Sequence, residues 1–490
     1  MITSLYQSLC NMETNIADRV ALRWYDEKKQ GVAEVHYAQY AQDLRRFVAF
    51  LRAEYGDVRG KRVAILARNS YQYVICMYGT VIAGAVAVPL NLGKDWDAIS
   101  YELGLTEPVC ILQDGEFAER EPALAETYGS ILKPMDVFAA YEPAEDVTEV
   151  EDLSALAFIM FTSGTTGRSK AVMLSERNFF TTVECQVKFG DAMLDYKHEH
   201  MPEDKNDVLS NFAILPLFHL GTFICLFVWA CKGWALNLSA DIRDFYRDLG
   251  LMHSDVMASA PMLVETIYND MKRGRVSRLN GLWDLCCSSA ALDPKMLLEL
   301  AQNGFVVNQC YGMTETFGDG ILNFTQVEKH MSAVGKPDDH VQYKLDETGE
   351  ICIKGDCVML GYYKDPEATA EVIDADGWFH TGDLARMDEE GFYYITGRKK
   401  NLIILASGEN VSPEELEKKL ALCPAITECI VKEKDQKICA VIYCPEDKQE
   451  EVRAFVIEVN RSLPLYKRIS AVEFTVEPLP RNALGKLLRK

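Results

Sequence analysis

Short apolar runs alternate with segments of helical spacing through the first third of the chain. Residues 61–67 and 85–90 have the length and composition of buried strands, and residues 69–84 between them have helical spacing. Strand–helix–strand repeats of this kind predict a parallel sheet covered by helices, and therefore an α/β fold. The same pattern predicts further buried strands, at residues 156–162, 208–215, 283–287 and 305–310.

One apolar stretch, residues 212–231, is long enough to span a bilayer. Pro216, His219 and Gly221 interrupt it, and the run before Pro216 has the length of a strand. We therefore expect a buried strand followed by a core helix, and no transmembrane segment.

A polar and charged segment, residues 191–207, shows no hydrophobic periodicity and is predicted to be a loop. His198 and His200 lie two positions apart in it and could bind a metal. No third ligand follows at a recognised spacing, so the solvated loop is the favoured interpretation.

Charge and cysteine content narrow the class of protein. The 490 residues are too many for one ordinary core, and their formal net charge of −22 disfavours binding to nucleic acid or to anionic membranes. Any polyanion must then be bound at a local basic site. The 15 cysteines include no C-x-x-C pair, and the N-terminus has no signal-peptide pattern. Reduced thiols in a cytoplasmic protein are expected.

The composition changes near Gly397. A basic tripeptide, residues 398–400, follows, and Ser412 before a proline and two glutamates is typical of a helix start. We expect a large N-terminal domain, residues 1–397, and a small C-terminal α/β domain, residues 398–490.

The most informative segment is FTSGTTGRSKAV, residues 161–172. Glycines let backbone N–H groups converge on an anion, hydroxyls add donors, and a lysine supplies a positive charge. The phosphate loop of nucleotide hydrolases requires adjacent glycine and lysine, so this loop is of another kind. Its candidate binding residues are Thr162, Ser163, Gly164, Thr165, Thr166, Gly167 and Lys170.

This segment resembles the phosphate-binding signature of the adenylate-forming superfamily, which includes acyl-CoA synthetases, luciferases and peptide-synthetase adenylation domains. Further motifs follow in the family's order: YGMTET (311–316), GEICIKGDCVMLGY (349–362), TGDL (381–384), GRKKNLI (397–403) and PRNALGK (480–486). The resemblance implies stacked, helix-covered sheets in the large domain and a small mobile C-terminal domain. It also implies ATP and CoA as co-substrates, Mg²⁺, and an acyl-AMP intermediate.

The resemblance also implies roles for residues of the YGMTET motif. Tyr311 would offer a flat face to the adenine base, and Thr314 a hydroxyl to phosphate. Glu315 would bind Mg²⁺ through a hard carboxylate oxygen, with help from Thr162.

Residues of the later motifs receive roles in the same way. Asp383 and Arg398 are similar to the residues that contact ribose, where a carboxylate suits a diol because it only accepts hydrogen bonds. Lys486 resembles the lysine that neutralises charge during adenylation. Lys400 matches the hinge about which the small domain rotates, and Gly408 the region that lines the pantetheine tunnel.

Substrate clues come from two motifs. His219, in LPLFHL (215–220), either has a functional role, orienting the substrate or assisting the thiol, or is a core histidine, and the sequence does not separate the two. Gly312 stands where acetate-specific relatives carry tryptophan, so it leaves room for a longer acid. Three apolar residues are expected to suit an alkyl chain: Phe218, Phe223 and Leu226. Ser288 and Ser289 replace the Gly-Gly of many relatives and narrow the adjoining space.

The sequence thus predicts an ATP-dependent carboxylic acid–CoA ligase that acts on a medium- or long-chain fatty acid. Its predicted catalytic residues are Lys486, Glu315, Thr314, Lys170 and His219. Two alternatives stay open: an acyl-AMP ligase that loads the phosphopantetheine of an acyl carrier protein, and a non-catalytic nucleotide-binding homologue.

Overall fold

The computed structural model describes residues 2–162, 168–204, 206–288, 292–318, 320–323, 327–405, 410–434, 437–481 and 487. Over this part of the chain the protein divides into two compact units. Unit 1 comprises Met1–Gln342 and Lys354–Phe379, and unit 2 comprises Tyr343–Ile353 and His380–Lys490.

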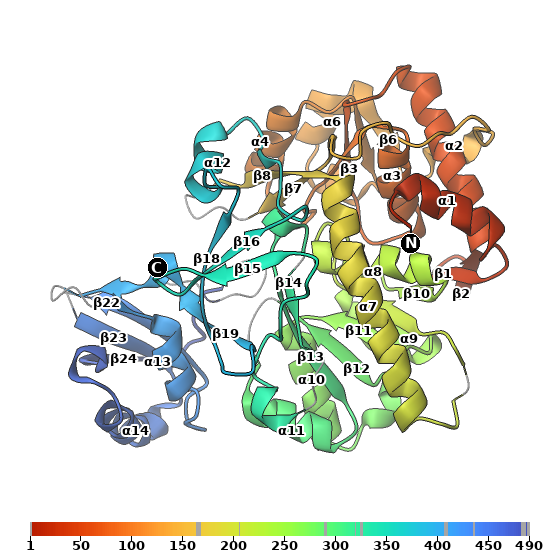
Figure 1. Cartoon of the computed structure of the whole chain (residues 1–490). Coiled ribbons are helices and arrows are strands. Elements are labelled where there is room, and N and C mark those ends of the chain that lie inside the picture. The colour runs from red at the N-terminus through yellow and green to blue at the C-terminus, as the bar shows by residue number, and fades with distance from the viewer. Residues whose placement is uncertain are drawn as a thin grey trace. The chain divides into compact units, whose positions relative to one another are not determined.

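Unit 1 contains the sheet that the early strand–helix pattern predicts (Figure 1). Its strands are β3 (Arg62–Leu66), β4 (Val86–Pro89), β5 (Cys110–Gln113), β6 (Leu132–Pro134), β7 (Leu156–Thr162), β8 (Lys170–Ser175) and β17 (Gly361–Tyr362). They are ordered β17-β8-β7-β4-β3-β5-β6. The strands from β7 to β6 are parallel, as predicted, whereas β8 is antiparallel to both β7 and β17.

A second sheet of unit 1 joins the start of the chain to its middle. Its strands are β1 (Val20–Asp26), β2 (Gly31–His36), β9 (Ser210–Ala213), β10 (Ala235–Leu238), β11 (Val256–Ser259), β12 (Asp284–Cys287), β13 (Val306–Gly312) and β14 (Gly320–Leu322). They are ordered β14-β13-β12-β11-β9-β10-β1-β2. The strands from β13 to β1 are parallel, so their carboxyl ends meet at one edge of the sheet.

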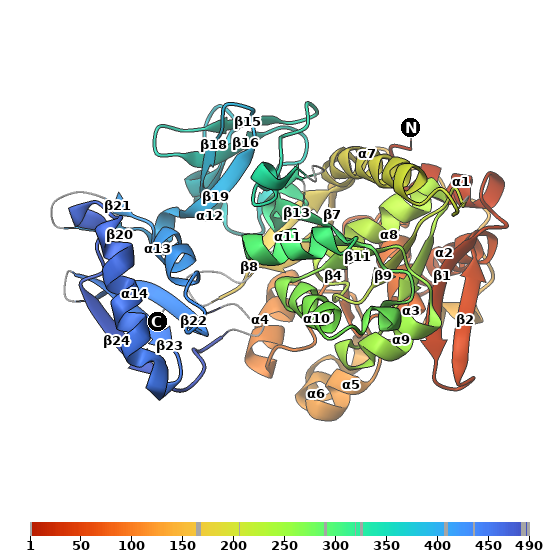
Figure 2. The ribbon, with the colours of Figure 1, turned by 90° about the horizontal axis from the view of Figure 1, so that it is seen from below.

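Helices pack on the sheets of unit 1 and bury apolar faces against them. They are α1 (Leu5–Thr14), α2 (Tyr37–Tyr55), α3 (Tyr71–Ile82), α4 (Trp96–Thr106), α5 (Glu116–Arg120), α6 (Ala123–Tyr128), α7 (Glu176–His200), α8 (Leu220–Lys232), α9 (Phe245–Leu251), α10 (Pro261–Lys272), α11 (Pro294–Gln302) and α12 (Pro366–Val372). Figure 2 shows α7 and α8 on one side of β9 and β11, with α9 and α10 on the other. The second sheet therefore has two buried faces.

Unit 2 contains smaller sheets. One is ordered β15-β16-β18-β19, with β15 (Gln342–Leu345), β16 (Glu350–Lys354), β18 (Phe379–Met387) and β19 (Tyr393–Arg398). The others contain β20 (Ile403–Ile404), β21 (Asn410–Val411), β22 (Glu428–Lys434), β23 (Lys437–Tyr443) and β24 (Ala471–Thr475). The helices are α13 (Pro413–Leu420) and α14 (Gln449–Arg461). The helix start predicted at Ser412 is confirmed, because Ser412 is the residue before α13.

The loop predicted over residues 191–207 is wrong for its first half, because α7 continues to His200. Helix α7 begins with a capping box between Ser175 and Asn178, and its apolar residues pack against α8 and β7. Buried contacts along the helix outweigh the polar composition of its last turns.

The strand and helix predicted within residues 212–231 are confirmed as β9 and α8. Among the described residues, every helix is either too short or too polar to cross a lipid bilayer. The predicted domain boundary after residue 397 stays a prediction. The compact units divide the chain earlier, because β16, β18 and β19 belong to one sheet.

Candidate active site

The phosphate-loop segment connects two paired strands. Thr162 ends β7, Lys170 begins β8, and the two residues are register partners in this antiparallel pair. Both side chains are half-buried. The loop residues between them lie outside the described residues: Ser163, Gly164, Thr165, Thr166 and Gly167. The hairpin thus fixes where the loop leaves and re-enters the sheet.

Tyr362 contacts both Lys170, at the end of this loop, and Glu315, the acidic residue of the YGMTET motif. Its hydroxyl donates a hydrogen bond to Glu315 Oε1 at 3.0 Å, and Lys170 Nζ lies 4.4 Å from the centroid of its ring. Burial, and then the charge of Glu315, raise the pKa of the Tyr362 hydroxyl, so it stays a neutral donor. Pairing of β17 with β8 holds Tyr362 opposite Val172. Residues distant in sequence therefore meet at one tyrosine.

The YGMTET motif lies at the carboxyl end of β13. Tyr311 and Gly312 end the strand, and Thr314 and Glu315 lie in a 3-10 turn directly after it. The Glu315 carbonyl accepts a hydrogen bond from Met359 N at 2.8 Å, which ties the turn to the segment that leads into β17. Gly312 is exposed, and the motif's other candidate side chains are half-buried.

Lys94 is a further candidate phosphate ligand, and it lies outside the sequence motifs. It follows β4, and its ammonium group donates to Ser169 Oγ at 3.1 Å and pairs with the buried carboxylate of Glu102. A second positive charge therefore lies beside the phosphate loop. A signal was present, because Lys94 follows the carboxyl end of a buried parallel strand, where α/β folds bind ligands.

In unit 2, Asp383 and Arg398 pair with each other. They are register partners on β18 and β19, and Arg398 Nε lies 2.6 Å from Asp383 Oδ1. Arg398 Nη2 also donates to Asp383 Oδ2 at 3.4 Å. Asp383 is buried and Arg398 is exposed, so the guanidinium group orients both carboxylate oxygens from the solvent side.

Glu350 organises the turn that carries Asp383, a role that its sequence motif does not indicate. Its Oε1 accepts from Gly382 N at 2.7 Å, and its Oε2 lies 2.7 Å from Lys399 Nζ. The Thr381 hydroxyl donates to Ile351 O at 2.8 Å. These bonds join the GEIC and TGDL segments to each other.

The remaining predicted residues of unit 2 are only partly placed. Lys400 is exposed and lies in the 3-10 turn Lys399–Asn401. Gly408 and Lys486 lie outside the described residues.

The predicted alkyl-binding residues do not all line open space. Phe223 and Leu226 are buried core residues of α8, and the ring of Phe223 lies 5.4 Å from those of Tyr78 and Phe179. The prediction for these two residues is wrong, because their side chains pack between α8 and its neighbours. Phe218 and His219 are half-buried, and their rings lie 4.5 Å apart.

His198 and His200, which lie in the segment predicted to be a loop, do not form a metal site with other described residues. His198 Nε2 lies 3.2 Å from Asp207 Oδ1, and the His200 ring stacks on Tyr196 at 4.0 Å. Two other groups of possible ligands do occur: Asp346, Glu350, Cys352 and His380, and Cys185, Asp338 and His340. In the first group Glu350 is already bound by Lys399 and Gly382.

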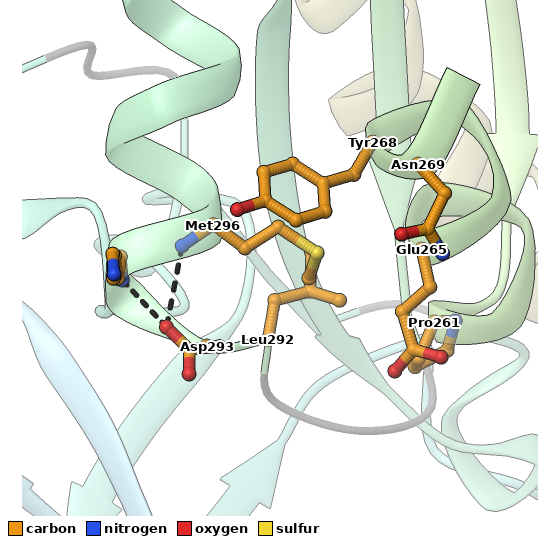
Figure 3. Close-up of a pocket in the computed structure, with 8 residues that line it drawn as sticks. Pro261, Glu265, Tyr268, Asn269, Leu292, Asp293 and Met296 are labelled. Atoms are coloured by element: carbon orange, nitrogen blue, oxygen red, sulfur yellow. Dashed lines mark hydrogen bonds between the residues drawn. The ribbon is translucent and has the colours of Figure 1, made fainter. Parts of the chain in front are cut away.

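A surface pocket of about 360 Å³ lies between α10 and α11 (Figure 3). Tyr268 and Met296 face each other across it, and Asp293 accepts hydrogen bonds from the Lys295 and Met296 N–H groups at the start of α11. The predicted site residues do not line this pocket, and Asp293 acts as a helix cap.

The fold and this arrangement define a class: an α/β protein in which two lysines, Lys170 and Lys94, lie at a glycine-containing loop between strands. Residues 12–363 match the model of the AMP-binding enzyme family, and the chain belongs to that family.

Relatives and solved structures agree with this assignment. The chain is 29% identical to a feruloyl-CoA synthase from Amycolatopsis sp, over 94% of each chain. It is also 29% identical to a 2-succinylbenzoate–CoA ligase from Bacillus licheniformis, over 94% of this chain and 95% of that one. By fold it is similar to ATP-bound MatB from Rhodopseudomonas palustris, with a TM-score of 0.83, 24% identity, and coverage of 99% and 97%.

A fatty acyl CoA synthetase from Mycobacterium tuberculosis has the same fold, with a TM-score of 0.74, 22% identity, and coverage of 99% and 97%. The predicted family, the α/β fold class and the class of AMP-forming acid–thiol ligase are confirmed, with ATP, Mg²⁺ and CoA as the molecules such ligases use. A fatty acid substrate stays a prediction, because the relatives named act on several kinds of acid.

Proposed function

We propose that the protein joins a carboxylic acid to CoA in two steps, through an acyl-AMP intermediate that it forms from ATP. The observation that carries the proposal is the meeting of Lys170 and Glu315 at Tyr362, beside the hairpin that carries the phosphate loop. A cation and a hard carboxylate at one loop are what transfer of a nucleotidyl group requires.

In the first step the substrate carboxylate attacks the α-phosphate of ATP, and pyrophosphate leaves. Lys170 neutralises charge on the phosphate oxygens, and Lys94 adds a second positive charge next to Ser169. Glu315 and Thr162 offer the hard oxygen ligands that Mg²⁺ prefers, so their chemistry fits the ion. When bound, Mg²⁺ stabilises the negative charge of the phosphates.

Contacts with the nucleoside are assigned as follows. Tyr311 stacks on adenine, and the Thr314 hydroxyl binds phosphate. Asp383 accepts hydrogen bonds from the ribose hydroxyls while Arg398 orients its carboxylate. Lys486 stabilises the departing pyrophosphate, Lys400 is the hinge, and Gly408 lines the path of the CoA thiol.

The acid is proposed to have a medium or long chain, which would give the enzyme a role in fatty acid or lipid metabolism. The protein is proposed to be cytoplasmic. Support for a long acid comes from Gly312, which is exposed at the end of β13 and has no side chain to block the neighbouring space. His219 is proposed to orient the acid or to assist the thiol.

The proposal is tested by pyrophosphate release with ATP, Mg²⁺ and acids from acetate to palmitate plus benzoate, with and without CoA. Release that requires CoA for turnover and peaks with a longer acid is expected. CoA-independent turnover would instead indicate transfer to an acyl carrier protein. Binding of ATP without release for any acid would favour a non-catalytic homologue.

Matched variants test which side chains act on the reacting phosphates. Lys170→Ala and Glu315→Gln are expected to lower the rate at least a hundredfold, since each removes charge stabilisation at the reacting phosphates. Lys364→Ala is the control. Lys364 is an exposed lysine that follows β17, the strand of Tyr362, and its ammonium group pairs with Glu107. Equal effects of all three substitutions would contradict the proposed site.

A further inference from the structure

A group of possible metal ligands lies on the four-stranded sheet of unit 2. Glu350 and Cys352 are two residues apart on β16, so their side chains point to the same face of the sheet. His380 is the second residue of the neighbouring strand β18 (Figure 1). Asp346 follows β15, and its Oδ1 accepts a hydrogen bond from Glu350 N at 2.8 Å. One ligand atom from each of these four side chains lies within 4.8 Å of all the others.

The distances within this group are those of a tetrahedral zinc site. Cys352 Sγ lies 3.5 Å from His380 Nδ1, and the same nitrogen lies 3.5 Å from Glu350 Oε2. Zinc bonds of about 2.3 Å to sulfur and about 2.0–2.2 Å to nitrogen or oxygen, at tetrahedral angles, separate neighbouring ligand atoms by about 3.3–3.6 Å. Thiolate, imidazole and carboxylate are also the ligands that zinc uses in proteins. Composition and spacing therefore both fit this ion.

The burial of the group suits an ion that is held by the protein and still reached from solvent. Cys352 is 0% exposed and Glu350 is 2% exposed, whereas His380 and Asp346 are half-buried. An ion can therefore enter past the histidine and the outer carboxylate. Mg²⁺ prefers oxygen ligands, so the thiol of Cys352 favours Zn²⁺ and sets this group apart from the proposed Mg²⁺ ligands of unit 1.

Lys399 supplies a positive charge to the group in the metal-free protein. Its Nζ lies 2.7 Å from Glu350 Oε2, and its side chain is 48% exposed. A lysine of this kind has a flexible stem and a strongly hydrated ammonium group, so its ion pair contributes little to stability. A divalent ion with several protein ligands can therefore displace it into solvent.

We propose that unit 2 binds a structural Zn²⁺ ion through Cys352, His380, Glu350 and Asp346, and that Lys399 leaves Glu350 when the ion binds. Cys352 binds as the thiolate, and its proton is released to solvent. All four tetrahedral positions are then filled by the protein, which is the arrangement of a structural zinc site. The inference goes beyond the proposed function and does not depend on it.

The ion would act on the turn that carries Asp383. Glu350 Oε1 accepts a hydrogen bond from Gly382 N, and Gly382 directly precedes Asp383. Zinc bound at Glu350 Oε2 leaves that hydrogen bond in place and fixes the carboxylate that makes it. Lys399 directly follows Arg398, the partner of Asp383, so its release also alters the strand end beside this pair.

The test titrates the full chain, treated with EDTA and dialysed, with Co²⁺ and Zn²⁺ in the presence of millimolar Mg²⁺. Co²⁺ is the spectroscopic probe, because a cobalt–thiolate bond gives an absorption band in the near ultraviolet. One equivalent of Co²⁺ is expected to produce this band. Zn²⁺ is expected to remove the band, since divalent zinc binds such ligands more tightly than cobalt.

Cys352→Ser should abolish the band, and both Cys352→Ser and His380→Ala should weaken Zn²⁺ binding at least tenfold, because even partners of metal ligands change the affinity tenfold or more when they are mutated. Cys439→Ser is the matched control. Cys439 is also a fully buried thiol of unit 2, on β23, and its variant should keep the wild-type band and affinity. Lys399→Met removes the competing ammonium group and should tighten Zn²⁺ binding at least twofold, a gain that a loss of folded protein does not produce.

Absence of both the band and Zn²⁺ binding in the wild-type chain would overturn the inference. A band that survives Cys352→Ser and is lost in Cys185→Ser would also overturn it, since the ion would then bind at the group of Cys185, Asp338 and His340. Unchanged Zn²⁺ affinity of Lys399→Met would contradict binding at the carboxylate that Lys399 contacts. These readouts do not involve pyrophosphate release, so failure of the proposed ligase function would leave their result unaffected.

Discussion

Removal of one hydroxyl group tests whether Tyr362 positions the acidic residue of the phosphate site. Tyr362→Phe deletes the donor that lies 3.0 Å from Glu315 Oε1 and keeps the ring beneath Lys170. Tyr362 is 6% exposed, and phenylalanine keeps the packing of its ring, so the variant should have the same fold.

A hydrogen bond to a charged group contributes about 1.5–3 kcal/mol. Since about 1.4 kcal/mol corresponds to a factor of ten in rate, loss of the bond should lower kcat for pyrophosphate release at least about tenfold. Because Glu315 is the proposed Mg²⁺ ligand, the Mg²⁺ concentration for half-maximal rate should rise as well.

The assay is pyrophosphate release titrated with Mg²⁺ at saturating ATP and acid. Tyr363→Phe is the control, because it removes the same hydroxyl from the next residue, whose ring contacts the exposed Lys364. A Tyr362→Phe enzyme with the rate and Mg²⁺ dependence of the control would refute the claim that this bond positions Glu315.

Three further predictions address the ribose site, the core and a buried acid. Arg398→Ala should raise the KM for ATP about two- to fivefold in steady-state kinetics, a modest effect because Arg398 is half exposed to water; an unchanged KM would contradict its role. Phe223→Ala should lower the free energy of unfolding by about 3–5 kcal/mol in denaturant titrations, whereas a residue lining an acyl pocket would mainly alter chain-length preference. Burial raises the pKa of Glu176 to about 7 from 4.5, so the contribution of this carboxyl to the stability of the folded state is complete below pH 4.5 and is lost as pH rises to 7. Glu176→Gln should remove about 3 kcal/mol of that pH dependence, and identical pH profiles of unfolding for both proteins would contradict the assignment.

Local signals in the sequence were sufficient for much of the fold. The strands β3, β4, β7, β12 and β13 lie within two residues of the predicted runs, because buried parallel strands are short, apolar and followed by polar turns. The end of α7 was not predictable in this way. Its last turns are polar and charged, and the helix is held by buried residues elsewhere along its length.

The candidate site also contains both residues that the sequence predicts and residues that only the structure reveals. Motifs identified Lys170, Glu315 and Asp383, because each lies in a short segment of distinctive composition. Tyr362 becomes visible only when β17 is placed beside β8, since Lys170 and Glu315 are distant from it in sequence. Lys94 follows a predicted strand, but its contact with Ser169 is visible only in the structure. Phe223 shows the opposite error, because an apolar residue near a motif can equally belong to the core.

The most direct test of the central claim is transfer of oxygen from the acid to AMP. An acid that is active in the pyrophosphate assay is labelled with oxygen-18 in its carboxyl group, and the AMP formed with ATP and CoA is analysed by mass spectrometry. Attack of the carboxylate on the α-phosphate predicts one labelled oxygen in the AMP phosphate once the acyl-AMP is cleaved by the thiol. Label in inorganic phosphate that is released together with ADP, or unlabelled AMP, would contradict an acyl-AMP intermediate.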